Sequence, residues 1–493
     1  MQSSRGTVRS AIAWLEKRYF AIDDRTLALV RIALGLLLLV DLGKRAAGLN
    51  VWYTDRGLLP RWLAQTHAPN SWSLFWLLGS PSQVIAGFVF CALCYTALAL
   101  GFVTRLAAAL SLCCAISLQH RIQLLAMGAD AVITLTLWWT LLLPTARRFS
   151  LDARFGRARP GYGSTTSVGA LGMKLQLAAI YFFNAVHKSG DTWSEGSAVH
   201  YSLWLDRVVT PFAVWLRDTL SATGSQLLSW ATRGTEALLP LLILSPIFVR
   251  WTHRTALLAV FGLHTGIALC MNVGLFSPAM MVLSLVLVSR QDWDALARRW
   301  PLLAAAQGDA APRTRLTPWA LSLREGFLVA LLWLVVTQLL TDNAAAVERV
   351  RFRPPDAQAW LVRQGRLAQG WSMFSPDVGI GEMTLIVDAT TEGGQRIDPY
   401  NGMGARLADP SLRAIPPAIG YDIYWHSYTR LVPDRRDLRG ALRSWIFWHH
   451  ERTRRPEDRI VRFRVIELTR PSPPLGESSI WPSAERVVLA AER

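Results

Sequence analysis

The chain has 493 residues, of which 52% are hydrophobic and only 18% are charged, and it contains 22 Trp. Soluble domains carry about 25% charged residues, so this composition excludes an ordinary soluble enzyme, a disordered protein and a coiled coil. The charge is strongly basic, with 52 Lys and Arg against 35 Asp and Glu. In a membrane protein such an excess is typical of loops held on the cytoplasmic side, so we expect membrane lipid as a partner and no nucleic acid.

Nine apolar segments are candidates to cross a membrane, although a hydrocarbon core needs about 20 apolar residues per helix and several segments are shorter. They are residues 26–42, 84–103, 106–118, 131–143, 168–186, 226–244, 255–270, 273–288 and 327–340. Almost nothing separates the seventh from the eighth, so these two must form a tight hairpin or share a kink. We therefore expect a transmembrane domain over residues 1–342.

The loop charges predict the orientation of these spans. An odd number of spans places the two termini on opposite sides of the membrane. With the N-terminus inside, the inner segments hold 19 Lys or Arg and the outer loops hold 8. This asymmetry predicts a multi-pass protein of the cell inner (plasma) membrane, with a cytoplasmic N-terminus and an extracytoplasmic C-terminal domain.

The tail, residues 343–493, has a different pattern. Alternating apolar runs at residues 383–387, 460–468 and 487–489 are separated by Pro and Gly turns, which is typical of short strands. The predicted fold is thus an α-helical polytopic membrane domain of about nine transmembrane helices, followed by a small β-rich extracytoplasmic domain.

Ionisable residues within membrane segments are functional-site candidates, because each costs about 2.5–3.5 kcal/mol to insert. They are Arg31, Asp41, Asp130, Lys174, Lys188, Arg233, Glu236 and His264. Arg233 and Glu236 are three residues apart on one helix and are expected to pair with each other. We interpret Arg31 and Asp41, like that pair, as structural charges.

The fifth span carries the most informative pattern. Lys174, Tyr181 and Lys188 are spaced by seven residues, with Asn184 between them, and seven residues bring a helix back to within about 20°. One face therefore carries four polar groups. Lys188 is either an anchor whose amine reaches the interface or a desolvated amine able to act as a base. The seventh span adds His264, for which a satisfied core position is the alternative.

A family resemblance appears just after this span. The sequence has V-H-K at residues 186–188, W-S-E-G at 193–196, then Tyr201, and T-P-F at 210–212. This resembles vitamin K-dependent γ-glutamyl carboxylase, which has V-K-K, W-x-E-G, a following Tyr and S-P-F at similar spacing. Further agreements, in the same order, are Arg31, Gly35 and Asp41, then Gly101 and Arg105, then Ser150-Leu151-Asp152, then Met271-Asn272 with Leu275-Phe276.

The resemblance runs from residue 31 to residue 290, and bacteria carry the same domain as the horizontally transferred transmembrane domain. Residues 371–376, W-S-M-F-S-P, resemble the W-x-M-F-x-P that follows the last span in the bacterial proteins. We expect this segment to pack on the membrane domain beside the loop at residues 189–217, where a peptide would enter. An independent domain on a flexible tether is the alternative.

The resemblance implies a bacterial membrane enzyme of the lyase class. Its reduced vitamin K or menaquinol would be oxygenated to the epoxide, and peptide Glu would be carboxylated, with O2 and CO2 as co-substrates and no metal. Lys188 stands where the family has the second Lys of V-K-K, the base that deprotonates the quinol. The supporting or substrate-binding residues would be Tyr181, Asn184, His187, Trp193, Glu195, Gly196, Tyr201, His264, Asn272 and His120. The partners would be the quinol and a peptide or protein with Glu residues.

The chain departs from the family in three ways, of which the missing His and the smaller tail favour a second hypothesis. The first Lys of V-K-K is His187, and the family His before Met-Asn falls at Leu269, so its role does not transfer to His264. The tail is also much smaller than the animal enzyme's outer domain. The alternative is a non-catalytic accessory membrane protein for the maturation of, or immunity to, a secreted peptide.

Overall fold

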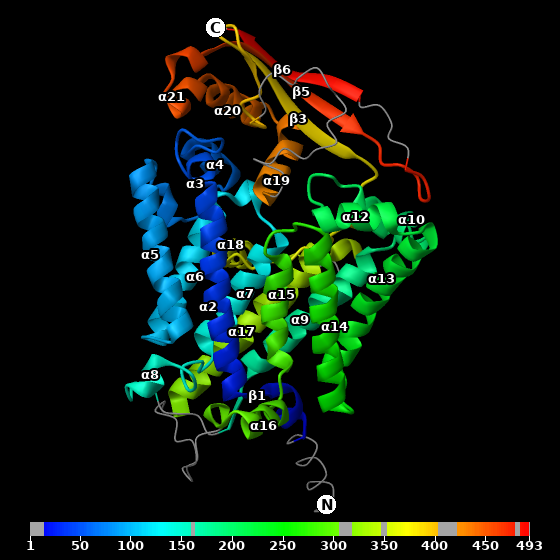
Figure 1. Cartoon of the computed structure of the whole chain (residues 1–493). Coiled ribbons are helices and arrows are strands. Elements are labelled where there is room, and N and C mark those ends of the chain that lie inside the picture. The colour runs from blue at the N-terminus through cyan, green and yellow to red at the C-terminus, as the bar shows by residue number, and fades with distance from the viewer. Residues whose placement is uncertain are drawn as a thin grey trace, which may run out of the picture.

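The computed structural model describes residues 14–158, 163–304, 318–346, 353–402, 422–478 and 484–492. Long helices form a bundle, the tail covers one end of it, and the two chain ends lie at opposite ends of the molecule (Figure 1). The bundle helices are α2 (Asp24–Ala47), α5 (Pro81–Leu100), α6 (Thr104–Arg121), α7 (Gly128–Leu142), α9 (Val168–His187), α13 (Ala222–Leu244), α14 (Val249–Cys270), α15 (Phe276–Ser284) and α17 (Pro318–Asp342).

Each of the nine predicted segments is helical in the structure, although the eighth keeps only the short α15 and a following turn. Within the described residues, five helices are long and apolar enough to cross a membrane: α2, α5, α9, α13 and α17. Helices α7 and α15 are apolar but shorter. The chain is thus a multi-pass membrane protein by its helices, while the count of nine spans stays a prediction.

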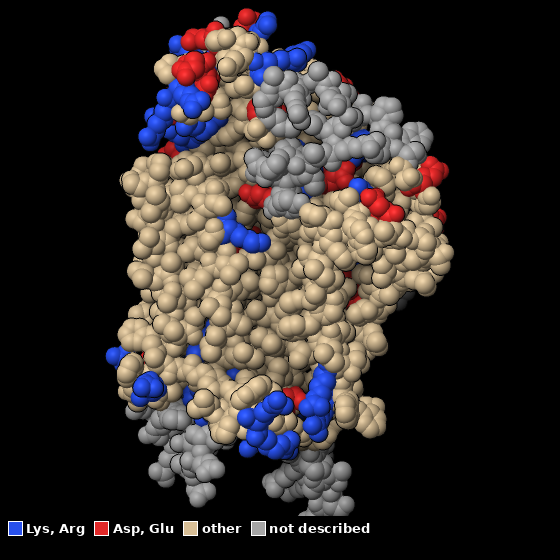
Figure 2. All heavy atoms as spheres, viewed as in Figure 1, with Lys and Arg blue, Asp and Glu red and all other residues tan. Residues whose placement is uncertain are grey.

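The outer surface of the bundle is apolar. Figure 2 shows a broad belt with few charged side chains, and Lys and Arg gather at the end of the bundle that is remote from the tail. The outward-facing side chains include Leu36, Val40, Leu93, Leu241, Leu258 and Trp333. A continuous apolar surface of this size marks contact with a membrane or a partner, and the helices that carry it bond their own backbone groups internally, as a lipid environment requires.

Several of the residues shared with the family serve this bundle. Gly101 ends α5 with φ +66°, and a Cβ at this position would lie 2.8 Å from the Arg31 guanidinium. Arg31 donates to the carbonyl oxygens of Thr145 at 2.6 Å and Phe149 at 2.5 Å. Asp152 accepts from the first backbone N–H groups of α6. These residues therefore join α2, the end of α5 and the start of α6.

The tail contains one antiparallel sheet with strand order β4-β3-β5-β6. The strands are β3 (Glu382–Thr391), β4 (Arg396–Ile397), β5 (Ile460–Arg470) and β6 (Ala484–Glu492), while β1 (Ala21–Asp23) and β2 (Ser164–Thr166) pair separately beneath the bundle. Strands β3, β5 and β6 contain the three predicted runs, so these predictions are confirmed.

The description of the tail as β-rich was incomplete, because helices occupy much of it. They are α18 (Asp356–Gly365), α19 (Ile423–Leu431), α20 (Arg436–Phe447) and α21 (His449–Thr453). Apolar side chains recur three and four residues apart in α20, where Leu438, Ala441, Leu442 and Trp445 are buried, and this is the pattern of a helix that covers a core. Basic residues between these apolar positions obscured the helical pattern in the sequence.

The tail packs directly on the bundle. The structure therefore does not show the alternative, an independent domain on a flexible tether. The Trp52 ring lies 5.0 Å from the Trp425 ring of α19. His67 of α4 (Arg61–His67) bonds Asp437 at 2.5 Å. Arg56 pairs with Glu451 at 2.8 Å.

A reporter fused after Arg493 would test the predicted orientation of the tail. We expect alkaline phosphatase at this position to be active, because the loop charges place the tail outside the cytoplasm. A cytoplasm-restricted fluorescent protein is the matched fusion and should remain dark there. Bright fluorescence with inactive phosphatase would contradict the orientation.

Candidate active site

A buried ion pair lies where α9 ends. Lys188 is the C-cap residue of α9, and its Nζ lies 2.5 Å from Glu236 Oε2 on α13. Lys188 is 4% exposed and Glu236 is 7% exposed. The Lys188 Nζ also lies 5.0 Å from the centre of the Trp193 ring. A carboxylate and the electron-rich face of an aromatic ring, both of which attract a cation, thus compensate the burial of this amine.

The expected pairing of Arg233 with Glu236 is wrong. Glu236 is buried against α9, whereas Arg233 is half-buried and forms no ion pair with any residue that the structure describes. Three residues separate the two side chains by about 60° round the helix. The carboxylate therefore meets the buried cation across the helix interface rather than the neighbour on its own helix.

The polar face of α9 continues inward from Lys188. Tyr181 bonds His264 Nε2 of α14 at 2.8 Å, and His264 Nδ1 lies 3.4 Å from Ser277 Oγ. Asn184 donates from Nδ2 to the carbonyl oxygen of Ile180 at 3.0 Å. Its Oδ1 is buried without a hydrogen-bond partner among the described residues. An unpartnered buried acceptor calls for an explanation, and here it lies one helical turn from Lys188.

Lys174 does not belong to this group. Its Nζ donates to the backbone carbonyl oxygens of Arg18, Tyr19 and Ala21 at 3.2–3.3 Å. Fourteen residues of α9 separate it from Lys188, which is about 21 Å along the helix. The sequence pattern was right about the shared face, but this face carries two separate clusters.

His187 joins the site to the tail. Its Nε2 lies 3.1 Å from Oδ1 of Asn343, which also accepts the backbone N–H of Trp371 at 3.0 Å. Asn343 is fully buried and donates to the carbonyl oxygen of Gln369 at 2.8 Å. Asn343, the first residue of the predicted tail, therefore links three segments by hydrogen bonds. They are the end of α9, the end of α17 and residues 369–371.

Residues 370–378, here called the cover segment, lie against the loop that follows Lys188. Trp193 Nε1 donates to the carbonyl oxygen of Phe374 at 2.8 Å. Gly190 N donates to the carbonyl oxygen of Pro376 at 3.1 Å. A Cβ on Gly190 would lie only 2.1 Å from the Asp377 carboxylate, so glycine permits this approach. The predicted contact between the two segments is present.

A crosslink would test this contact in solution. The Thr192 backbone N–H and hydroxyl both donate to Asp377 Oδ1, at 2.7 and 2.8 Å. We expect Thr192→Cys combined with Asp377→Cys to form a disulfide under mild oxidation, since the two side chains already touch. The two variants that carry only one of these introduced cysteines should remain uncrosslinked. A well-folded pair that never crosslinks would show that the cover segment leaves this loop.

Four further predicted site residues follow Lys188 in the sequence, namely Glu195, Gly196, Tyr201 and Asn272. Glu195 is exposed, and the carboxylate that meets Lys188 is Glu236 instead. Tyr201 packs in a small cluster with Trp193. The Asn272 backbone N–H donates to the carbonyl oxygen of Val208 at 2.6 Å. Gly196 has φ +82° at the turn after α10 (Asp191–Ser194).

His120 and Asp41 also lie elsewhere. His120 is buried at the end of α6, between the carbonyl oxygens of Trp72 and Arg363 at 2.7 and 3.2 Å. Asp41 accepts from Arg45 Nε at 2.6 Å. Arg45 was not among the predicted buried cations, although its place four residues after Asp41 was a signal of pairing.

The loop after α11 (Ala198–Leu203) forms charged contacts with the tail. Asp206 pairs with Arg217 at 2.8 Å and also with Arg470 of β5. Burial raises the pKa of the Glu382 carboxyl, at the start of β3, to about 7, against the lowering effect of Arg207. Burial also lowers the pKa of Arg207. The sheet is therefore held to the bundle by charged groups that have left bulk water.

Within the described ranges, no group of three His, Cys, Asp or Glu is placed to hold a metal ion. Residues 19–293 match the model of the HTTM domain. The chain belongs to the HTTM domain family. This domain is found in vitamin K-dependent carboxylase. Comparison with curated proteins and with solved structures finds no match.

Within the HTTM domain lie Lys188, Trp193, Glu236 and His264. The cover segment and Asn343 come from outside the matched residues. The candidate site is thus an HTTM-domain site that the tail of this chain closes.

Proposed function

We propose that this HTTM-domain protein is a membrane enzyme that oxygenates a reduced naphthoquinone, vitamin K or a menaquinol, to its epoxide and carboxylates Glu in a peptide. One observation carries the proposal. The buried amine of Lys188, paired with Glu236 and covered by Trp193, occupies the position that the resemblance gives to the base. Its setting at a helix end under the tail suits a reaction between a lipid-soluble quinol and a polar peptide.

The pair would act as one base. In the ion pair, Lys188 is an ammonium and Glu236 is a carboxylate. When a quinol hydroxyl gives up its proton, the pair becomes an ammonium and a carboxylic acid, and the quinol keeps the negative charge. Glu236 thus takes up the proton while Lys188 keeps its charge, so the pair carries one positive charge beside the negative quinol.

The residues beside the pair fit a quinol. The buried Oδ1 of Asn184 lacks a partner among the described residues and could accept a hydrogen bond from a phenolic O–H. The Trp193 ring offers an aromatic face on which a quinol ring could stack. When bound, the quinol would supply the reaction with O2 that forms the epoxide and generates a base strong enough to remove a γ-hydrogen from Glu. The cover segment would exclude water from this chemistry.

The test is direct. Purified protein in lipid nanodiscs receives reduced vitamin K or a menaquinol with O2, and chromatography measures the epoxide. Addition of a Glu-containing peptide and labelled CO2 then measures carboxylation separately. We expect epoxide from at least one quinol. A folded protein that yields none from either quinol would rule out the proposal.

One observation favours the accessory protein as a second candidate. Lys188 is fully paired with Glu236, which is also how a purely structural buried cation is satisfied. In that case the folded protein would consume no quinol, and its loss from cells would alter the maturation of, or immunity to, a secreted peptide instead. The quinol assay therefore separates the two.

A further inference from the structure

A cavity of about 580 Å³ lies at the end of α9 remote from Lys188. Residues 14–23, the start of α14 and residues 286–291 form its walls. The cationic side chains that line it are Lys17, Arg18, Lys174, Arg250 and Arg290. Asp23 is the acidic residue among the lining residues that the structure describes.

Two of these cations are buried without an acidic partner. Arg18 is 7% exposed and Lys174 is 4% exposed. Arg18 donates from Nη2 to the carbonyl oxygen of Ser245, but its Nε and Nη1 are buried with no partner among the described residues. Lys174 bonds only backbone carbonyl oxygens within the same part of the chain. Buried charges in proteins are normally paired with an opposite charge. These two unpaired cations therefore indicate that the cavity can bind an anion.

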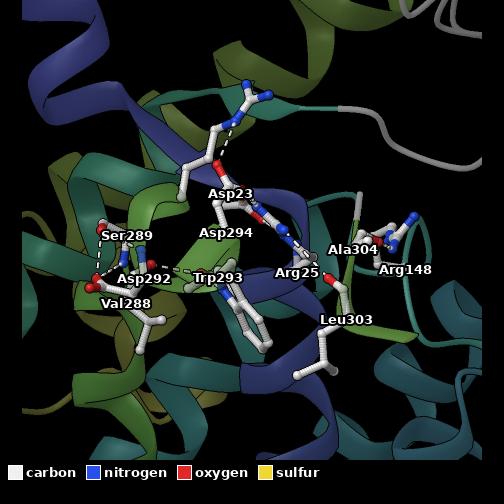
Figure 3. Close-up of polar contacts among 12 residues, drawn as sticks. Asp23, Arg25, Arg148, Val288, Ser289, Asp292, Trp293, Asp294, Leu303 and Ala304 are labelled. Atoms are coloured by element: carbon white, nitrogen blue, oxygen red, sulfur yellow. Dashed lines mark hydrogen bonds and ion pairs between the residues drawn. The ribbon is translucent and has the colours of Figure 1, made fainter. Parts of the chain in front are cut away.

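The nearby carboxylates are engaged elsewhere. Asp23 pairs with Arg25 at 2.9 Å, and Arg25 reaches Asp294 at 2.9 Å (Figure 3). Ser289 is the N-cap of α16 (Arg290–Arg299), and its backbone N–H donates to the Asp292 carboxylate at 3.0 Å. Asp292 also pairs with Arg254 at 2.5 Å. Arg25 and Arg254, which lie outside the cationic group, pair with these carboxylates, and Asp294 also lies 3.8 Å from Arg290 of the group. Five cationic residues against Asp23 leave the lining with a net positive charge.

We propose that this cavity binds a phosphate group, supplied by the headgroup of an anionic phospholipid. The unpartnered Nε and Nη1 of Arg18 are each a donor for an anionic oxygen, and basic pockets between membrane helices recognise such headgroups. Apolar residues also line the cavity, including Trp14, Ile22 and Val249, as an amphiphile requires. The cavity lies at the end of the bundle where Lys and Arg gather (Figure 2).

Native mass spectrometry in neutral detergent would test this site, with phosphatidylglycerol and phosphatidylcholine as the probes. We expect wild-type protein to retain phosphatidylglycerol preferentially. Arg18→Gln should weaken this binding about tenfold or more, since a hydrogen bond to a charged group is lost. Arg154→Gln is the matched control, because Arg154 is exposed on α8 (Leu151–Arg154) at the same end of the bundle, and it should bind as wild type does.

Two further arms keep the test decisive. If Arg18→Gln fails to fold, Lys17→Gln with Arg250→Gln replaces it, because both side chains are exposed at the rim, and it should weaken the same binding. Titration with inorganic phosphate distinguishes a lipid headgroup from a free anion. If phosphate binds without lipid, and the same variants lose this binding, the same groups bind a free anion. Equal retention of the two lipids with no phosphate binding, or variants that bind as well as wild type, would overturn the proposal.

Discussion

Replacement of Lys188 by Met is expected to abolish epoxide formation and to destabilise the fold at the same time. The proposed base is removed, and a positioned general base contributes about 10²- to 10⁴-fold in rate. Glu236 would remain buried without a cation. Removal of one partner from a buried ion pair costs about 3–5 kcal/mol in the free energy of unfolding. The epoxide yield and the midpoint of thermal unfolding measure the two effects.

A double variant separates chemistry from stability. Lys188→Met with Glu236→Leu removes both charges, and an apolar replacement of a buried pair is often neutral or stabilising. We therefore expect this variant to regain stability and to remain inactive. Arg233→Gln is the control on the same helix and should keep both properties. Wild-type epoxide yield from the double variant would exclude the pair as the base, and a double variant as unstable as Lys188→Met would show that the unpaired charge is not the cause.

The bundle helices and three strands of the tail could be predicted because their signals are local. Apolar length identified the helical segments, and alternation identified β3, β5 and β6. The seven-residue spacing of Tyr181 and Lys188 correctly placed them on one face, since helical geometry alone determines it. The boundary of the first span was less accurate. The apolar run stops at residue 42, but α2 continues to Ala47, because charged residues with good helix propensity extend a helix beyond its apolar part.

The contacts of the candidate site could not be predicted, because they join distant segments. Lys188 and Glu236 are 48 residues apart, and only the packing of α9 on α13 brings them together. Sequence reasoning favoured Arg233 because it weighs neighbours on one helix. The bond from Trp193 to Phe374 spans 181 residues. The cavity beside Lys174 arises in the same way, from residues of the N-terminal segment, α9 and α14.

The other large effect is expected at Arg45, which is 1% exposed at the tail end of α2. Its guanidinium bonds Asp41 at 2.6 Å, Asp130 at 2.7 Å and the Tyr53 hydroxyl at 3.1 Å.

Arg45→Met would leave the carboxylates of Asp41 and Asp130 facing each other without a cation. Because each is held in a poorly hydrated site, we expect a loss of at least about 3–5 kcal/mol in the free energy of unfolding. Lys44→Met is the matched control, since Lys44 is the preceding residue, carries the same charge and is exposed, and surface substitutions change stability by only about 0.5 kcal/mol. Thermal unfolding of both variants in detergent, followed by size-exclusion chromatography, measures the difference. Arg45→Met and Lys44→Met proteins that unfold at the same temperature would show that the buried arginine does not hold α2 to α7.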